Sequence, residues 1–272
     1  MGDAHSVFLI GAIVFPVGAL ILLFAYGYYI WRGQCLIAKY SKCDCTRWTS
    51  TRWIYPIFAV SLFLVGVLYI SMYLGQGTAA KPNNLTVMWE RWLVLAIVAF
   101  LYSRALTYIM TIKSDDEQSF MLVFLYTLAY AVLLFAVLSQ AFQTRLLWSI
   151  VSIILFIASM VFYFFPDNKF ACAYHIPSRL QYYQAFFAFI LLYYVANMII
   201  YFLAASNEYT NVLDFNQEAL AYLIIDILFI AGFALLIVIA TFFNLKDTVR
   251  LVNKTTHAVS YASNNRNLLS KL

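Results

Sequence analysis

One carboxylate lies inside a segment that is otherwise apolar enough to cross a lipid bilayer. Asp226 is near the middle of residues 215–243, a run dominated by leucine, isoleucine, alanine and phenylalanine. An ionisable side chain at that depth is energetically costly and by default marks a functional site. We therefore expect Asp226 to need a partner group.

Arg91 is a candidate for that partner. It lies within the apolar residues 87–112, deeper than Arg104, whose guanidinium is close enough to the segment's end to reach the interface. The Arg91 side chain can turn inward to a carboxylate. Alternatively, it can extend outward to Glu90 or Glu218, and Asp226 is then neutral.

Catalytic and metal-binding patterns are absent from the sequence. There is no glycine-rich phosphate loop, no HExxH pair and no Ser/His/Asp arrangement, and all three histidines fall outside the apolar segments. The spacing Cys43-Asp44-Cys45 is not that of a zinc site, and no second cysteine pair is nearby. We expect no enzyme activity, no metal and no cofactor.

The composition is that of a membrane protein. Hydrophobic residues make up 64% of the 272 residues and charged residues only 11%, with a mean hydropathy of +0.83. Soluble domains have about 25% charged residues. Several runs exceed the ~20 apolar residues that a helix needs to span the hydrocarbon core. We expect an all-α bundle of seven transmembrane helices, at about residues 7–31, 53–75, 87–112, 119–141, 145–165, 180–205 and 217–243.

The basic residues predict the orientation of the bundle. Most of the 17 Lys and Arg residues follow the first, third, fifth and seventh segments, and the first of these loops, Arg32 to Arg52, is strongly basic. Cytoplasmic loops are enriched in Lys and Arg, so the N-terminus is expected outside and the C-terminus in the cytoplasm. The net charge of +5 then reflects topology, and no basic face indicates nucleic-acid binding. We expect residues 1–245 to form the membrane domain and residues 246–272 a cytoplasmic tail.

Two loops contain candidate modification sites. Asn84-Leu85-Thr86 is an N-glycosylation sequon on the expected outer side, although such short motifs also occur by chance. Cys43 and Cys45 lie in the first cytoplasmic loop, where they are either ordinary thiols or sites of juxtamembrane palmitoylation.

Four short motifs, in order along the chain, resemble the microbial (type 1) rhodopsins. The last segment resembles the seventh helix of that family, in which an aspartate is followed four residues later by the lysine that binds retinal, and then by a Gly-Phe pair. Here the series is Asp226, Ile230 and Gly232-Phe233. The other motifs are Tyr69-Ile70-Ser71-Met72 in the second segment, Trp92-Leu93 in the third and Leu147-Trp148-Ser149 in the fifth.

The departures from this family concern its chromophore. Ile230 occupies the position of the retinal lysine, and Arg91 that of the counterion aspartate. The resemblance therefore implies a protein without covalent retinal. It also implies a vestigial pocket formed by Trp92, Tyr194, Tyr201 and Phe229.

The loss of the lysine leaves Asp226 without its cation, and an unpaired buried charge is strongly unfavourable. We expect Arg91 to pair with Asp226 and to supply the positive charge that the lysine would have provided. The alternative is an outward-facing Arg91 and a neutral Asp226.

Three functions are compatible with these features. The first is a non-photoactive, opsin-like protein with a structural or scaffolding role. The second is an ion channel or transporter whose polar outer vestibule contains Glu90 and Glu218. The third is a non-covalent binder of retinal or a carotenoid. The expected partners are the lipid bilayer and, as the resemblance implies, further copies of the chain or other membrane proteins.

Overall fold

The structure is a computed structural model, and it describes residues 2–39, 54–76, 78–80, 86–110, 117–164, 177–204 and 212–236. Asn84, Cys43, Cys45 and the tail 246–272 lie outside these residues, so the expectations for them remain predictions. Orientation in the membrane also remains a prediction.

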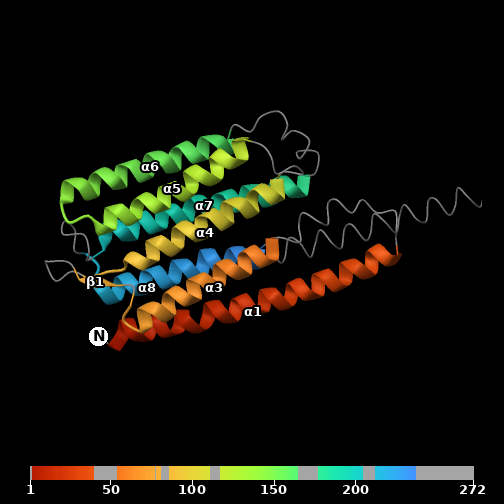
Figure 1. Ribbon diagram of the computed structural model, residues 1–272, viewed down its shortest axis with the longest axis horizontal. Helices are drawn as coiled ribbons and strands as arrows, with labels where there is room; N and C mark the ends of the chain where they lie inside the picture. Colours follow the sequence, from red (N-terminus) through yellow and green to blue (C-terminus); the bar gives the residue numbers. More distant parts are fainter. Residues whose placement is uncertain are drawn as a thin grey trace, which may run out of the picture.

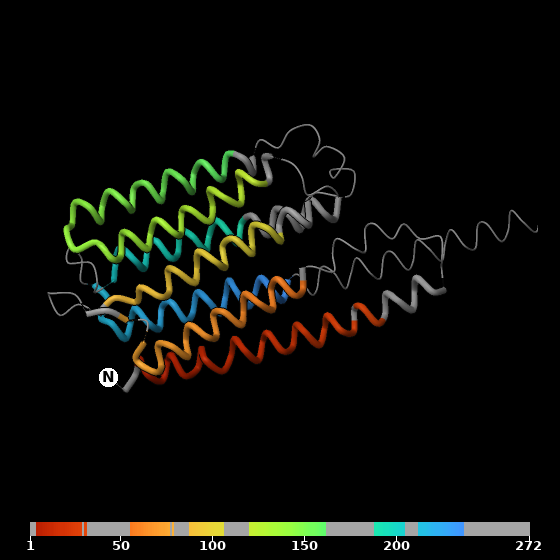
Figure 2. Tube along the Cα trace, viewed as in Figure 1, coloured from red at the N-terminus to blue at the C-terminus, as the bar shows by residue number. Residues whose placement is uncertain are grey.

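The described residues form seven long helices and one short hairpin (Figure 1). The first and last helices, α1 (Gly2–Lys39) and α8 (Phe215–Asp226), are in contact, so the bundle closes on itself. Figure 2 traces the chain from α1 in red to α8 in blue. The helices are α1 (Gly2–Lys39), α3 (Ile54–Tyr73), α4 (Trp89–Met110), α5 (Glu117–Leu138), α6 (Phe142–Phe164), α7 (Pro177–Leu203) and α8 (Phe215–Asp226), and α8 continues through a π-helical turn, η2 (Ile227–Ala231), to residue 236.

The first helix is longer than the sequence predicted. We expected a span at 7–31 and a loop from Arg32, whereas α1 begins at Gly2 and ends at Lys39. Hydropathy indicates where a chain leaves the lipid, and that point need not be where its helix ends. Residues 34–39 are mostly good helix formers, so α1 continues beyond its apolar part.

Short structures precede both α4 and α8. The end of α3 is a Schellman motif, in which Gly75 has a φ of 75° and the N–H of Gln76 donates to the Ser71 carbonyl at 2.9 Å. Strands β1 (Ala79–Ala80) and β2 (Thr86–Val87) then pair antiparallel and lead into α4. Asp214 caps α8 through a capping box with Gln217. These elements fix the starts of the two helices that carry Arg91 and Asp226.

Five of the helices are long and apolar enough to cross a membrane when only the described residues are considered. They contain the spans Ala4–Tyr28, Tyr55–Tyr73, Phe120–Leu138, Phe142–Val161 and Phe215–Leu236, and α7 adds the shorter apolar stretch Ala188–Leu203. The remaining helix, α4, carries Glu90, Arg91 and Arg104 and packs between α3 and α5.

Helix α6 turns three serines into the bundle and a row of aliphatic side chains outwards. Ser149, Ser152 and Ser159 are at most 1% exposed. The outer face carries exposed aliphatic residues, namely Leu147, Ile150, Ile154, Ile157 and Val161. Small residues at helix contacts permit close packing in lipid, and an apolar exterior suits a lipid solvent. The arrangement is therefore that of a membrane bundle.

Gly66 allows α1 and α3 to pack closely. A Cβ atom at Gly66 would lie 2.6 Å from the Cγ atom of Pro16 on α1, and the proline ring cannot rotate away. By contrast, a Cβ at Gly27 would meet nothing within 4 Å.

We therefore expect Gly66→Ala to lower the free energy of unfolding by about 1–3 kcal/mol, because the α1–α3 contact becomes overpacked. The matched control Gly27→Ala should be neutral or should stabilise the helix by up to about 1 kcal/mol. Equilibrium unfolding in mixed detergent micelles, followed by circular dichroism, measures both values. Equal effects of the two substitutions would contradict the packing described.

Candidate functional site: a buried ion pair joining four helices

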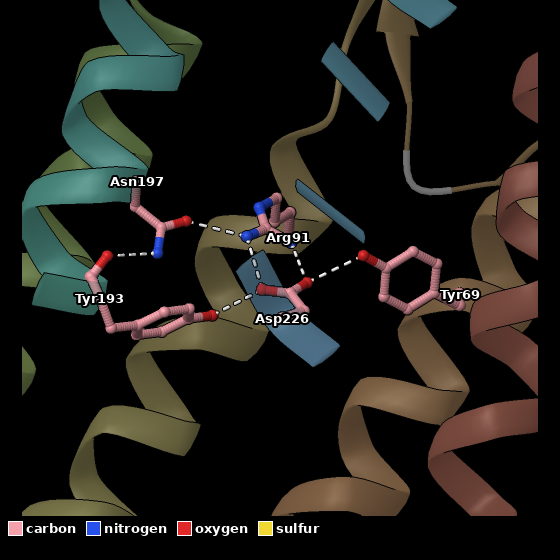
Figure 3. A network of polar contacts seen from close by, with 5 residues as sticks. All are labelled: Tyr69, Arg91, Tyr193, Asn197 and Asp226. Atoms are coloured by element: carbon pink, nitrogen blue, oxygen red, sulfur yellow. Dashed lines mark hydrogen bonds and ion pairs between the residues drawn. The ribbon is translucent and has the colours of Figure 1, made fainter. Parts of the chain in front are cut away.

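The structure places Arg91 and Asp226 in direct contact in the bundle interior (Figure 3). Arg91 lies in the first turn of α4 and is 1% exposed, whereas Asp226 is the last residue of α8 and is 0% exposed. The Arg91 Nη1 atom contacts Asp226 Oδ2, and Nη2 donates to Oδ1 at 2.8 Å. This is the two-pronged geometry that suits a guanidinium and a carboxylate.

Two tyrosines complete the environment of Asp226, approaching it from opposite sides (Figure 3). The Tyr69 hydroxyl on α3 donates to Oδ2 at 2.8 Å, and the Tyr193 hydroxyl on α7 donates to Oδ1 at 2.7 Å. Each carboxylate oxygen thus accepts two hydrogen bonds, which is about its full capacity. The carboxylate joins α3, α4, α7 and α8.

The Arg91 guanidinium is held by two further side chains. Its Nη2 atom donates to the Asn197 side-chain oxygen at 2.8 Å, and the Asn197 amide nitrogen donates to the Tyr193 carbonyl at 2.8 Å. The Tyr222 ring lies under the guanidinium, with its centroid 3.9 Å from Cζ, which is a cation–π geometry. The orientation of Arg91 is therefore fixed on three sides.

Gly11 allows Tyr69 to approach this site. A Cβ at Gly11 would lie 2.4 Å from ring atoms of Tyr69, and the Phe15 ring stacks on the same tyrosine at a centroid distance of 5.4 Å. Helix α1 thus positions the Tyr69 hydroxyl without contributing a polar group to the site.

The helix that carries Asp226 changes its geometry directly after it. Residues Ile227–Ala231 form a π-helical turn, which is a rare form that occurs mostly as a single turn within an α-helix, often at a functional site. The Tyr102 hydroxyl on α4 donates to the Ile230 carbonyl at 3.2 Å. The Phe58 and Phe233 rings hold the Tyr102 ring at centroid distances of 4.7 and 4.9 Å.

We expect Tyr102→Phe to destabilise the protein by about 0.5–1.5 kcal/mol, because the buried hydrogen bond from the Tyr102 hydroxyl to the Ile230 carbonyl is lost. The control Tyr28→Phe removes a hydroxyl from a residue that is 54% exposed on α1, and it should change stability by less than about 0.5 kcal/mol. Equilibrium unfolding in mixed micelles, followed by circular dichroism, measures the stability of both variants. If Tyr102→Phe were as stable as the control, the hydroxyl would not support the π turn.

Aromatic rings fill the interior beside this site. Phe229 contacts the rings of Phe189 and Tyr193 at 5.7 and 5.6 Å. Towards α5 and α6, a second group packs ring against ring and consists of Tyr126, Tyr130, Phe156 and Tyr194. Ile230 itself is 0% exposed.

Of the four residues expected to form a vestigial pocket, Trp92 and Tyr201 are in contact, whereas Tyr194 and Phe229 each pack against other rings. Tyr194 shares a 2.7 Å hydrogen bond with Ser152 and stacks on Phe156, so it lies against α5 and α6. Tyr201 and Trp92 pack edge to face at 5.7 Å. Phe229 lies beside Tyr193.

Glu90 and Glu218 differ in their surroundings. Glu90 is half-buried and accepts a hydrogen bond of 2.6 Å from Ser71 on α3. Glu218 is 4% exposed, and its Oε2 atom has no hydrogen-bond partner in the part of the chain that is described. Across the same residues, no group of three His, Cys, Asp or Glu side chains could hold a metal ion.

Sequence reasoning did not identify Tyr193 and Asn197 as members of the site. On this helix it named Tyr194 and Tyr201, and named them for the vestigial pocket; Tyr201 follows Asn197 by four residues, whereas Tyr194 lies against Ser152. The signal that could have identified the correct face is the spacing of four residues between Tyr193 and Asn197, because side chains so spaced lie on one face of a helix.

By fold, the chain is an integral, multi-pass membrane protein built as a seven-helix bundle. By sequence, it matches no known family model and no curated protein. Its structure, however, is similar to solved structures of microbial rhodopsins.

Three of these structures illustrate the similarity. The thermophilic rhodopsin from Rubrobacter xylanophilus has a TM-score of 0.73 at 16% identity, covering 87% of this chain and 95% of that one. A cyanorhodopsin from Tolypothrix sp. NIES-4075 has a TM-score of 0.70 at 19% identity, with coverage of 88% and 94%. The light-driven proton pump from Coccomyxa subellipsoidea has a TM-score of 0.70 at 16% identity, with coverage of 88% and 97%.

The chain therefore has the microbial-rhodopsin fold. The predicted fold class and the multi-pass membrane localisation are confirmed.

Proposed function

We propose that this protein is a non-photoactive, opsin-like membrane protein that forms no covalent bond to retinal and has a structural or scaffolding role. The observation that carries the proposal is the Arg91–Asp226 pair, with an aliphatic side chain at Ile230, four residues after Asp226. A guanidinium that uses both of its terminal nitrogens in hydrogen bonds is a permanent cation that fills the role of a protonated Schiff base.

The chemistry of the interior supports the absence of a covalent chromophore. A retinal imine requires a lysine amine, and among the described helices the sequence has a lysine only at Lys39, the last residue of α1. Ile230 offers only a hydrocarbon side chain. The closely packed rings around Phe229 and Tyr194 also occupy the space between the helices.

A passive role is further supported by the hydrogen bonding of Asp226. Its two oxygens accept four hydrogen bonds from Tyr69, Arg91 and Tyr193. With four donors already bound, the carboxylate has no lone pair left for a further hydrogen bond. The site is therefore suited to holding four helices together rather than to transferring protons.

A second candidate function, an ion channel or transporter, has one observation in its favour. Glu218 is buried with an unpartnered carboxylate oxygen, as a polar pathway would require. Below it, however, the pathway meets the Arg91–Asp226 pair and then the apolar Phe229, Ile230 and Phe233. A continuous hydrated path is needed for conduction, so the geometry favours the first candidate.

Two measurements test the choice. In proteoliposomes we expect no light-dependent pH change and no ion flux above that of empty liposomes. In the native membrane, we expect chemical cross-linking to trap the protein in a stable complex with itself or with another membrane protein. Ion flux that Asp226→Asn abolishes would favour the channel, and flux together with an uncross-linked monomer would overturn the proposal.

A further inference from the structure

Ser152 is fully buried on α6 and joins three helices through its hydroxyl group. Its Oγ atom donates to the Ala129 carbonyl on α5 at 2.7 Å, and it lies 2.7 Å from the Tyr194 hydroxyl oxygen on α7. A serine hydroxyl has one hydrogen, and the bond to Ala129 uses it, so Tyr194 is the donor in the second bond. The other two serines of α6, Ser149 and Ser159, donate to carbonyls of their own helix.

The ring of Tyr194 is held in place as well as its hydroxyl. It stacks on Phe156 of α6 at a centroid distance of 3.8 Å, with 6° between the ring planes, and it meets Tyr130 of α5 edge to face at 5.4 Å. All three residues are at most 4% exposed. Helices α5 and α6 therefore fix the direction in which this side chain leaves α7.

The neighbouring residue on α7 belongs to the ion-pair site. The Tyr193 hydroxyl donates to Asp226 at 2.7 Å (Figure 3). One turn later, the Asn197 side-chain oxygen accepts from Arg91 at 2.8 Å. Adjacent side chains on a helix differ in direction by about 100°, so α7 is held at two different faces.

The two sets of bonds must agree on the rotation of α7. A rotation of about 10° moves an atom ~6 Å from the helix axis by about 1 Å. That shift is enough to break a hydrogen bond between hydroxyl and carboxylate oxygens, since such bonds are about 2.5–3.0 Å long. The position of Tyr194 therefore limits where the Tyr193 hydroxyl can lie.

We propose that Ser152 is a positioning residue of the Arg91–Asp226 site. Through Tyr194, it sets the rotation of α7 at which the Tyr193 hydroxyl reaches Asp226. Among the described residues Ser152 forms hydrogen bonds to Ala129 and Tyr194, so it acts on the ion pair through the helix. The inference rests on the structural role proposed above for the ion pair.

A set of four proteins tests this coupling: the wild type, Ser152→Ala, Tyr193→Phe and the double variant. Ser152→Ala removes the acceptor of the Tyr194 hydroxyl, so α7 can turn and the bond from Tyr193 to Asp226 weakens. Tyr193→Phe then has less left to remove. We expect the double variant to lose clearly less melting temperature in detergent than the two single variants lose together.

Ser159→Ala is the matched control for Ser152→Ala. Ser159 is also fully buried on α6, and its hydroxyl donates to the Phe156 carbonyl of the same helix at 2.7 Å. Its loss should simply add to that of Tyr193→Phe, as it does for sites that share no partner. If the losses of Ser152→Ala and Tyr193→Phe are also additive, the proposal is overturned. Tyr194→Phe removes the same hydrogen bond from the α7 side and serves if Ser152→Ala does not fold.

Solid-state NMR reads the ion pair itself. In protein labelled with ¹³C at aspartate Cγ and with ¹⁵N in arginine, contact between Asp226 and Arg91 gives a carbon–nitrogen cross-peak. Ser152→Ala should shift this peak, whereas Ser159→Ala should leave it unchanged. A peak that Ser152→Ala does not move would contradict the positioning role alone. A wild-type spectrum without the peak would contradict the ion pair, and with it both the proposed function and this inference.

Discussion

Arg91→Met is expected to lower the free energy of unfolding by about 3–5 kcal/mol, because it leaves the fully buried Asp226 as an uncompensated charge. The measurement is equilibrium unfolding in mixed micelles. Arg91→Lys should lose less, since it keeps the positive charge and loses only the two-pronged geometry and the stacking on Tyr222. This variant separates the contribution of charge from that of shape.

The double variant Arg91→Met/Asp226→Leu shows whether the two residues act as a pair. An apolar replacement of both partners of a buried ion pair is often neutral or stabilising. Here it leaves Tyr69 and Tyr193 without their acceptor and Asn197 without its donor. The double variant should therefore regain only part of the stability that Arg91→Met loses. We expect a coupling near the upper end of the range of about 0.5–3 kcal/mol that contacting residues show. Additive losses would mean that the contact does not contribute to stability.

Ile230→Lys should also destabilise the protein strongly, by about 3–5 kcal/mol, because it introduces a buried cation with no free carboxylate. The residue is 0% exposed, and Asp226, four residues earlier, is already neutralised by Arg91. The control Ile230→Met has a similar length without charge and should cost less than about 1.5 kcal/mol. Thermal unfolding of both variants gives the comparison.

The same lysine should have the opposite effect when Arg91 is absent. In the double variant Arg91→Met/Ile230→Lys, the lysine can supply the cation that Asp226 has lost, since acid and base four residues apart on one helix face can pair. We expect the double variant to be more stable than Arg91→Met alone. If the lysine destabilises both backgrounds equally, Arg91 does not occupy the role of the missing amine.

The sequence contained enough information to predict the fold and to suggest the ion pair. Long apolar runs identify membrane helices because lipid imposes one length and one polarity on them. Asp226 and Arg91 attracted attention because charges at such depth are rare. The alternatives for Arg91 were Glu90 and Glu218, and only the packing of α4 against α7 and the neighbouring α8 places its side chain at Asp226.

The rest of the site depends on rotations that sequence patterns do not specify. Adjacent residues on a helix differ in direction by about 100°. The Tyr193 hydroxyl therefore reaches Asp226, whereas the hydroxyl of the adjacent Tyr194, which the sequence analysis named for the vestigial pocket, lies against Ser152. The π turn at Ile227–Ala231 has no evident sequence signal, and its Tyr102 partner is distant along the chain.

The most direct test of the central claim is whether the protein can form a pigment. The chain should be expressed with all-trans retinal supplied, purified, and measured both by visible absorption and by intact mass after borohydride reduction. With Arg91 as the permanent partner of Asp226 and Ile230 in place of an amine, we predict no visible band and the mass of the unmodified chain. A visible band together with a retinyl adduct on the protein would contradict the account.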